Sequence, residues 1–219
     1  MYKAAIFDLD GTIADTVISI AVACNKALVK CGLMERPIEE YNYYAGDGVD
    51  TLVKRALYAA GDKEYIHYDT ALVLYKEIFE EYCTYEVKAY DDMKETLEYM
   101  KSKGMKLAVL TNKPHDRAVT VVESLYGKDL FDYILGQQEG IAKKPDPEGA
   151  LLVASKLSVN PLECIYVGDT NVDMQTGNAS GMYTVGVLWG FRDRKELEEN
   201  HAHVIIKNPR ELKELILRG

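Results

Sequence analysis

From residue 91 onward, short apolar runs alternate with segments of helical periodicity, and this alternation restricts the fold more than any other feature of the chain. A first apolar run, 4–7, stands far upstream, and the later predicted strands are 105–110, 131–135, 164–167, 183–187 and 204–206. Helices are expected at 91–103, 115–126, 147–157, 171–179 and 211–217. Strands separated by helices form parallel βαβ units. The sequence therefore predicts an α/β fold, a doubly wound, Rossmann-like parallel sheet with helices on both faces.

Residues 15–90 interrupt this pattern, because they are predicted to be almost entirely helical. Apolar side chains recur there at helical spacing, and Gly32 and Gly61 are placed to end helices. We therefore expect an α/β core formed by residues 1–14 and 91–219, with an α-helical domain, 15–90, inserted after the first strand.

The charge balance excludes some classes of partner. The chain has 219 residues with 26 Lys and Arg against 35 Asp and Glu, a net charge of −9, and no basic run. This argues against binding nucleic acid or an anionic membrane surface. No stretch approaches the ~20 apolar residues of a membrane span, the N-terminus does not resemble a signal peptide, and the four cysteines lack C-x-x-C spacing. We expect a cytoplasmic protein with reduced thiols.

Groups suited to chemistry gather where the predicted strands end. In chain order they are Asp8, Asp10, Thr111, Lys144, Asp169 and Asp173. Each alone is more typical of a turn, a helix cap or a surface charge. In an open parallel sheet, however, ligands bind beyond the carboxyl ends of the strands, where the strand order reverses. The combination therefore predicts one shared site.

Four segments resemble, in the correct order, the signature motifs of the haloacid dehalogenase superfamily of phosphatases and phosphomutases. They are FDLDGT at 7–12, LTN at 110–112, KPDP at 144–147 and VGDTNVDM at 167–174. The resemblance spans residues 4–187, and the helical segment 15–90 is similar to the inserted cap of one subclass. It implies the family's α/β core with a helical cap.

The resemblance also implies the roles of the catalytic residues. Asp8 would be the nucleophile that forms an aspartyl-phosphate, and Asp10 would protonate the leaving alcohol and then activate water. Thr111 would donate a hydrogen bond to the phosphoryl oxygens with the Asn112 backbone amide alongside, and Lys144 would neutralise the phosphate. The family's dehalogenase branch lacks the second acid, so Asp10 favours phosphoryl transfer over dehalogenation.

By the same resemblance the cofactor would be Mg²⁺, which prefers oxygen ligands. The matching ligands are the Asp8 carboxylate, the Asp10 backbone carbonyl and Asp169. Asp173 would either ligate the metal or hold a water bound to it. The family pattern also places Thr12 among the substrate-binding residues.

A further segment, 43–57, resembles the cap of bacterial phosphoglycolate phosphatases. Its Gly-x-Gly turn, Gly46, Asp47 and Gly48, would present backbone amides to the far end of the substrate; the alternative is a simple loop before a helix. Asp47 departs from expectation because it puts an acid where an anion would approach. Arg36 and Arg55 are the candidate clamps for a substrate carboxylate.

The sequence therefore predicts a Mg²⁺-dependent hydrolase of a small phosphorylated metabolite, with phosphoglycolate as the leading substrate. Alternatives are a pyrophosphatase, a sugar phosphomutase similar to β-phosphoglucomutase, a phosphonate-cleaving enzyme that uses a cap lysine, and a non-catalytic binding protein. The expected assembly is a monomer or a homodimer.

Overall fold

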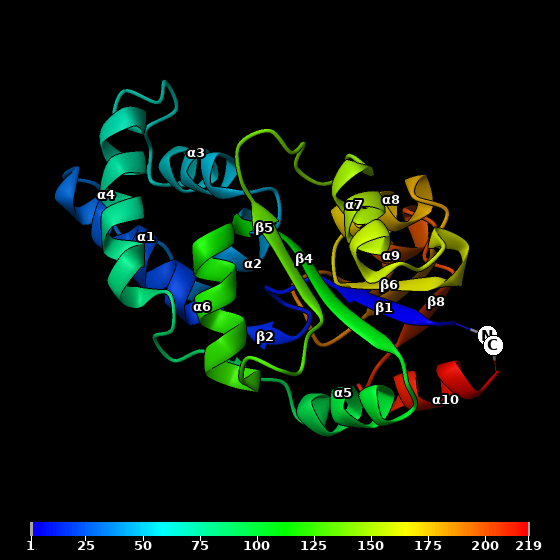
Figure 1. Cartoon of the computed structure of the whole chain (residues 1–219). Coiled ribbons are helices and arrows are strands. Elements are labelled where there is room, and N and C mark those ends of the chain that lie inside the picture. The colour runs from blue at the N-terminus through cyan, green and yellow to red at the C-terminus, as the bar shows by residue number, and fades with distance from the viewer. Residues whose placement is uncertain (1, 219) are drawn as a thin grey trace. The chain divides into compact units, whose positions relative to one another are not determined.

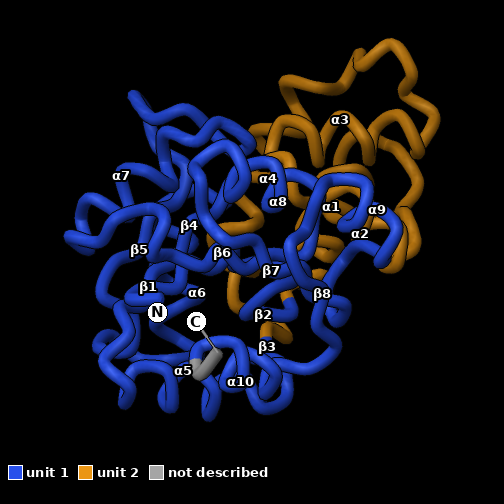
Figure 2. The backbone as a smooth tube through the Cα atoms, turned by 90° about the vertical axis from the view of Figure 1, so that its right-hand side faces the viewer, with its two compact units in different colours: residues 1–15, 88–219 blue, residues 16–87 orange. Residues whose placement is uncertain are grey.

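The computed structural model describes residues 2–218, and side chains as far as residue 216. Contacts divide the chain into two compact units, one formed by the residues up to Asp15 together with those from Lys88 onward, the other by Thr16–Val87. Figure 2 colours the two units separately.

The larger unit is built on a parallel sheet with the strand order β5-β4-β1-β6-β7-β8 (Figure 1). Its strands are β1 (Ala4–Phe7), β4 (Lys106–Pro114), β5 (Tyr133–Gln137), β6 (Cys164–Gly168), β7 (Tyr183–Val187) and β8 (Val204–Ile206). The chain runs from β1 outward through β4 to β5, and then returns to β6 on the other side of β1. The strand order therefore reverses at β1, which is where a ligand crevice is expected in such a sheet.

Helices cover both faces of this sheet. They are α5 (Met93–Ser102), α6 (His115–Tyr126), α7 (Glu148–Leu157), α8 (Asn171–Ala179), α9 (Arg194–Glu199) and α10 (Glu211–Arg218). Figure 1 shows α7 and α8 on one side of the sheet and α5 and α10 on the other. Ile6 packs with Val153 of α7 in one core cluster, whereas the Phe7 ring meets Phe131, which meets Tyr126 of α6. Successive β1 side chains thus serve opposite faces, and this confirms the predicted doubly wound α/β class.

The predicted strand 105–110 is too short. In the structure β4 continues through Pro114, which pairs with Gln137 after an irregularity in the ladder. Thr111, Asn112 and Lys113 were expected to follow the strand, but they belong to it. Gly136 on β5 makes this possible, because a Cβ there would collide with the Lys113 carbonyl oxygen.

One helix and two short strands were also not predicted. Helix α9 has a charged sequence in which Leu197 is buried, so it lacks an apolar stripe. The short strands β2 (Ala14–Asp15) and β3 (Lys88–Ala89) pair antiparallel where the chain leaves and re-enters the larger unit.

The smaller unit is helical, with α1 (Val17–Lys30), a short 3-10 turn (Ile38–Glu40), α2 (Tyr41–Tyr44), α3 (Val49–Ala59) and α4 (Tyr68–Tyr82). Its core includes the stacked rings of Tyr75 and Phe79. The hydroxyl of buried Tyr41 donates to Asn25 Oδ1 at 2.7 Å. The helical content of this segment is as predicted, whereas its role as a cap stays a prediction.

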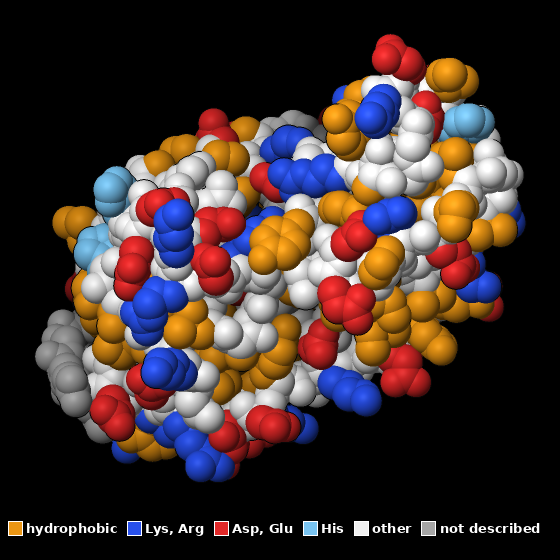
Figure 3. Space-filling model, turned by 180° about the vertical axis from the view of Figure 1, so that it is seen from behind, with side chains coloured by type: hydrophobic (Ala, Val, Ile, Leu, Met, Phe, Trp, Pro, Cys, Tyr) orange, Lys and Arg blue, Asp and Glu red, His pale blue; other side chains and the backbone are white. Residues whose placement is uncertain are grey.

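Charged groups of both signs are interspersed on the face shown in Figure 3. All four cysteines are free thiols, as their spacing predicts. Among the described residues, no helix is long and apolar enough to cross a membrane.

Candidate active site

The site lies beyond the carboxyl ends of β1 and β6. The two strands are in register, with Phe7 opposite Val167, and the Asp8 backbone N–H donates to the Val167 carbonyl at 2.9 Å. Asp8 directly follows β1 and Asp169 directly follows β6. Parallel pairing therefore brings two carboxylates that are distant in the sequence to the same edge of the sheet.

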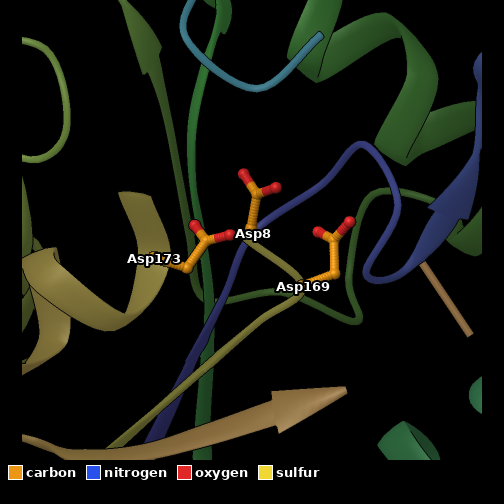
Figure 4. A group of neighbouring side chains, drawn as sticks. All are labelled: Asp8, Asp169 and Asp173. Carbon is orange, nitrogen blue, oxygen red and sulfur yellow. The ribbon is translucent and has the colours of Figure 1, made fainter. Parts of the chain in front are cut away.

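Asp8, Asp169 and Asp173 form a cluster of buried carboxylates. One oxygen from each lies within 4.8 Å of the others, and Figure 4 shows the three side chains converging from the loop after β1, the loop after β6 and the first turn of α8. The Asp169 carboxylate is fixed by the Thr12 hydroxyl, which donates to it at 2.8 Å, and by the Phe191 N–H at 2.7 Å.

Asp173 belongs to a capping box at the start of α8. Its Oδ2 accepts hydrogen bonds from the backbone N–H and the hydroxyl of Thr170, at 3.0 and 2.8 Å. A carboxylate in the first turn of a helix is also stabilised by the helix dipole. The fold therefore holds Asp173 in one orientation and leaves its Oδ1 directed at Lys144, 2.7 Å away.

Lys144 bridges the cluster. Its Nζ lies 2.7 Å from Asp8 Oδ1 and 2.7 Å from Asp173 Oδ1, and its side chain is 4% exposed. Asn112 fixes the lysine from β4, since its Oδ1 accepts from the Lys144 N–H at 2.9 Å and its Nδ2 donates to the Lys144 carbonyl at 3.1 Å. The ammonium is thus built into the site rather than free to sample solvent.

The buried charges do not balance within the protein. Burial raises the pKa of Asp8 to about 7, although Lys144 lowers it, and burial together with the two neighbouring carboxylates raises the pKa of Asp169 well above its usual value. Burial lowers the pKa of Lys144, but Asp173 and Asp8 more than offset this and raise it well above the usual value. When all three carboxylates are ionised, they exceed the one ammonium by two negative charges, which a divalent cation would neutralise. The residues present therefore fit a metal ion.

Close packing of backbone on these carboxylates depends on three glycines, since a Cβ on Gly190 would collide with the Asp169 side chain. Gly11 has a φ of +88°, and a Cβ there would collide with the Asp169 carboxylate. A Cβ on Gly168 would collide with the Asp173 side chain. Any other residue at these positions would displace a carboxylate of the cluster.

Sequence reasoning missed a second buried lysine in the site. Lys113 Nζ lies 2.7 Å from Asp10 Oδ1, with side-chain exposures of 3% and 14%. Thr111 and Lys113 are two residues apart on β4, in the stretch where its ladder with β5 is irregular. The Lys113 N–H also donates to Thr111 Oγ1 at 3.2 Å. Extending the predicted strand by three residues would have indicated this lysine.

Most of the predicted site residues lie in three hydrogen-bonded groups. Direct contacts connect Asp8, Asp173, Lys144 and Asn112, and also Thr12 with Asp169. Asp10 and Thr111 both contact Lys113. The catalytic, substrate-binding and metal-binding roles of these residues stay predictions.

The Gly46-Asp47-Gly48 turn belongs to the helical unit. Both glycines have positive φ, +108° and +89°. Arg55 Nη1 lies 2.6 Å from Asp47 Oδ2 and also donates to the backbone carbonyls of Tyr43 and Tyr44. The acid that seemed out of place in the sequence is therefore paired with a cation.

Comparisons with known proteins agree with this geometry. Residues 5–187 match the family described as haloacid dehalogenase-like hydrolase. The chain is 30% identical to the phosphoglycolate phosphatase of Nitrosospira multiformis, over 99% of this chain and 96% of that protein. It is 34% identical to the phosphoglycolate phosphatase of Aquifex aeolicus, over 86% of each.

A crystal structure of a protein from Lactobacillus delbrueckii subsp. bulgaricus superposes with a TM-score of 0.92, at 32% identity over 98% of both chains. The family match covers most of the chain, including every strand end from which the site is built. The chain therefore belongs to the haloacid dehalogenase-like hydrolase family.

Proposed function

We propose that this protein is a Mg²⁺-dependent phosphomonoester hydrolase whose substrate is 2-phosphoglycolate. The observation that carries the proposal is the buried Asp8 carboxylate, held 2.7 Å from Lys144 within a cluster whose net charge calls for a divalent cation. The names of the relatives at 30% and 34% identity support the choice of substrate.

The proposed reaction has two in-line steps. In the first, an Asp8 oxygen attacks phosphorus, the bond from phosphorus to the glycolate oxygen breaks, and Asp10 gives its proton to that oxygen. In the second, water attacks the phosphorus, Asp10 accepts the water proton, and the bond to Asp8 breaks to release inorganic phosphate. Asp10 ends each cycle in the protonation state in which it began.

The chain's own groups stabilise both steps. Lys144 neutralises the phosphoryl oxygens and the Asp8 carboxylate, and its position is fixed by Asp173 and Asn112. When bound, Mg²⁺ would be held by Asp8, Asp169 and the Asp10 backbone carbonyl, with Asp173 beside them, and would supply positive charge for the transferring group. An all-oxygen ligand set favours Mg²⁺ over softer metals.

We also infer that the enzyme acts in the cytoplasm, which its four free thiols favour.

A phosphate-release screen tests the proposal. The purified protein is assayed with Mg²⁺ against 2-phosphoglycolate, several sugar phosphates, nucleoside monophosphates and pyrophosphate, and Asp8→Asn is the control for contaminating phosphatase. We expect the highest kcat/KM with 2-phosphoglycolate. A preference of orders of magnitude for pyrophosphate would overturn the proposal. So would a sugar phosphate that is isomerised without release of inorganic phosphate, which is the behaviour of a mutase.

A further inference from the structure

The site contains two buried ammonium groups at two different places. Lys144 contacts Asp8, which is the proposed nucleophile, whereas Lys113 contacts Asp10, which is the proposed proton donor. Nucleophile and proton donor must act on opposite sides of the transferring phosphorus. Lys144 therefore serves the nucleophile, and the Lys113 charge lies at the end of the site where the alcohol leaves.

Lys113 is held in place by the strand on which it lies. Its N–H donates to Thr111 Oγ1 at 3.2 Å, and its carbonyl packs so closely on β5 that a Cβ on Gly136 would approach it to 2.7 Å. Its side chain is 3% exposed. A buried ammonium that is held beside Asp10 is a localised positive charge, which suits recognition of a small anion.

We infer that Lys113 determines specificity by binding the carboxylate of the leaving group, an inference that rests on the proposed function. The leaving oxygen must come within hydrogen-bond distance of Asp10 to receive its proton. In glycolate the carboxylate carbon is two bonds from that oxygen. An ammonium 2.7 Å from Asp10 is therefore within reach of this carboxylate. A phosphomonoester whose alcohol carries no anion gains nothing from Lys113.

The helical unit offers no comparable group among its arginines. Its two arginines, Arg36 and Arg55, are both engaged within the unit: Arg36 contacts Glu40 through two nitrogens, and Arg55 contacts Asp47. Each guanidinium is directed at a partner within the helical unit. Lys113 is also paired, but its partner Asp10 is the group that the leaving oxygen must approach, so its ammonium can meet the leaving group's carboxylate while it stays beside Asp10.

The test compares two substrates that differ only in the anion. 2-Phosphoglycolate and 2-hydroxyethyl phosphate have the same chain length, and only the first carries a carboxylate. The readout is the ratio of their kcat/KM values in the wild type and in Lys113→Met, Lys113→Gln and Lys113→Arg. The glutamine keeps a donor for Asp10 without the charge, and the arginine keeps the charge. Lys106→Met, on the same strand but exposed, is the matched control.

We expect the ratio of kcat/KM for 2-phosphoglycolate to that for 2-hydroxyethyl phosphate to fall about 10- to 100-fold in both neutral variants, as for the loss of a hydrogen-bonded charge pair. The ratio should be largely restored in Lys113→Arg. It should equal that of the wild type in Lys106→Met. Both substrates also lose rate through the broken contact with Asp10, and the ratio removes this shared loss. An unchanged ratio in a folded neutral variant would overturn the inference and leave the proposed function standing. A wild type that does not hydrolyse 2-phosphoglycolate would instead refute the proposed function itself.

Discussion

The side chain of Asn112 forms two hydrogen bonds with the backbone of Lys144, a residue 32 positions later in the chain. Both groups are buried. The contact joins β4 to the loop before α7 and fixes the position of the Lys144 backbone relative to the strand. It gives Asn112 a structural task that the sequence did not reveal, because only its backbone amide was expected to matter.

Replacing Asn112 with Ala is expected to lower kcat by about 10- to 100-fold and stability by about 1–3 kcal/mol, since it leaves the Lys144 N–H buried without its acceptor. Phosphate release and urea denaturation measure the two effects. Asn160→Ala is the control, because Asn160 caps an exposed 3-10 turn far from the site. It should lose a little stability and no activity. Equal activity loss in both variants would contradict the positioning role.

The nucleophile prediction is tested at Asp8. Asp8→Asn keeps the shape of the side chain but removes the attacking carboxylate, so we expect phosphate release to fall on the order of 10⁴-fold or more. Circular dichroism should show an unchanged fold. Exposed Asp129→Asn is the control and should retain full activity. Turnover near the wild-type rate in Asp8→Asn would exclude Asp8 as the nucleophile.

Metal binding is tested through a residue that does not itself ligate. The Thr12 hydroxyl donates to Asp169 at 2.8 Å, so Thr12→Val leaves this carboxylate less well oriented. We expect EDTA to abolish activity, Mg²⁺ to restore it, and the Mg²⁺ concentration for half-maximal activity to rise about 10- to 100-fold in Thr12→Val. Thr120→Val, on the exposed side of α6, should behave as the wild type. Full activity after thorough chelation would refute the metal role.

The pH dependence of stability follows from the raised pKa of Asp8. In the folded, metal-free protein this pKa is about 7, whereas an unfolded Asp has a pKa of about 4. Between these values the folded state binds the extra proton, so the contribution of Asp8 to stability is greatest below about pH 4 and falls as the pH rises towards 7. Asp8→Asn removes this contribution, whereas that of Asp169, whose pKa is also raised, remains.

Urea denaturation of the metal-free wild type and Asp8→Asn, from pH 4 to 8, measures this effect. Between pH 4 and pH 8, the unfolding free energy of Asp8→Asn minus that of the wild type should rise by up to about 4 kcal/mol. Saturating Mg²⁺ should flatten the wild-type profile, because the cation replaces the proton. A wild-type profile parallel to that of the variant in the absence of metal would contradict the burial argument.

Much of the site follows from the sequence because parallel pairing is a strong constraint. Once Asp8 and Asp169 each end a strand, adjacent parallel strands must bring them together. Asp173 follows from the first turn of the helix after Asp169. These residues are close for reasons of backbone geometry, and side-chain detail is not needed to place them.

Lys113 and α9 were missed for different physical reasons. Thr111-Asn112-Lys113-Pro114 is polar and ends in proline, so locally it has the composition of a turn. It continues β4 because Leu110, just before it, and Pro114, at its end, both pair with β5, and these contacts are tertiary. Helix α9 carries five charged residues among its six, so the apolar periodicity that indicates a helix is absent. Contacts with distant segments override local pattern in the first case, and no pattern exists in the second.

The turn in the helical unit gives the last prediction. If Gly46–Gly48 meets the substrate, as the sequence predicts, the charge of Asp47 must be neutralised, and Arg55 lies 2.6 Å from it. Arg55→Met exposes the anionic substrate to this carboxylate, so KM should rise about two- to fivefold with little change in kcat, as for a partly exposed ion pair.

The double variant Arg55→Met with Asp47→Asn removes both charges and should restore most of the wild-type KM. Arg194→Met breaks an exposed pair with Glu198, to which no substrate role is assigned, and serves as the control. A KM that rises equally in both arginine variants, or in neither, would show that the turn does not meet the substrate.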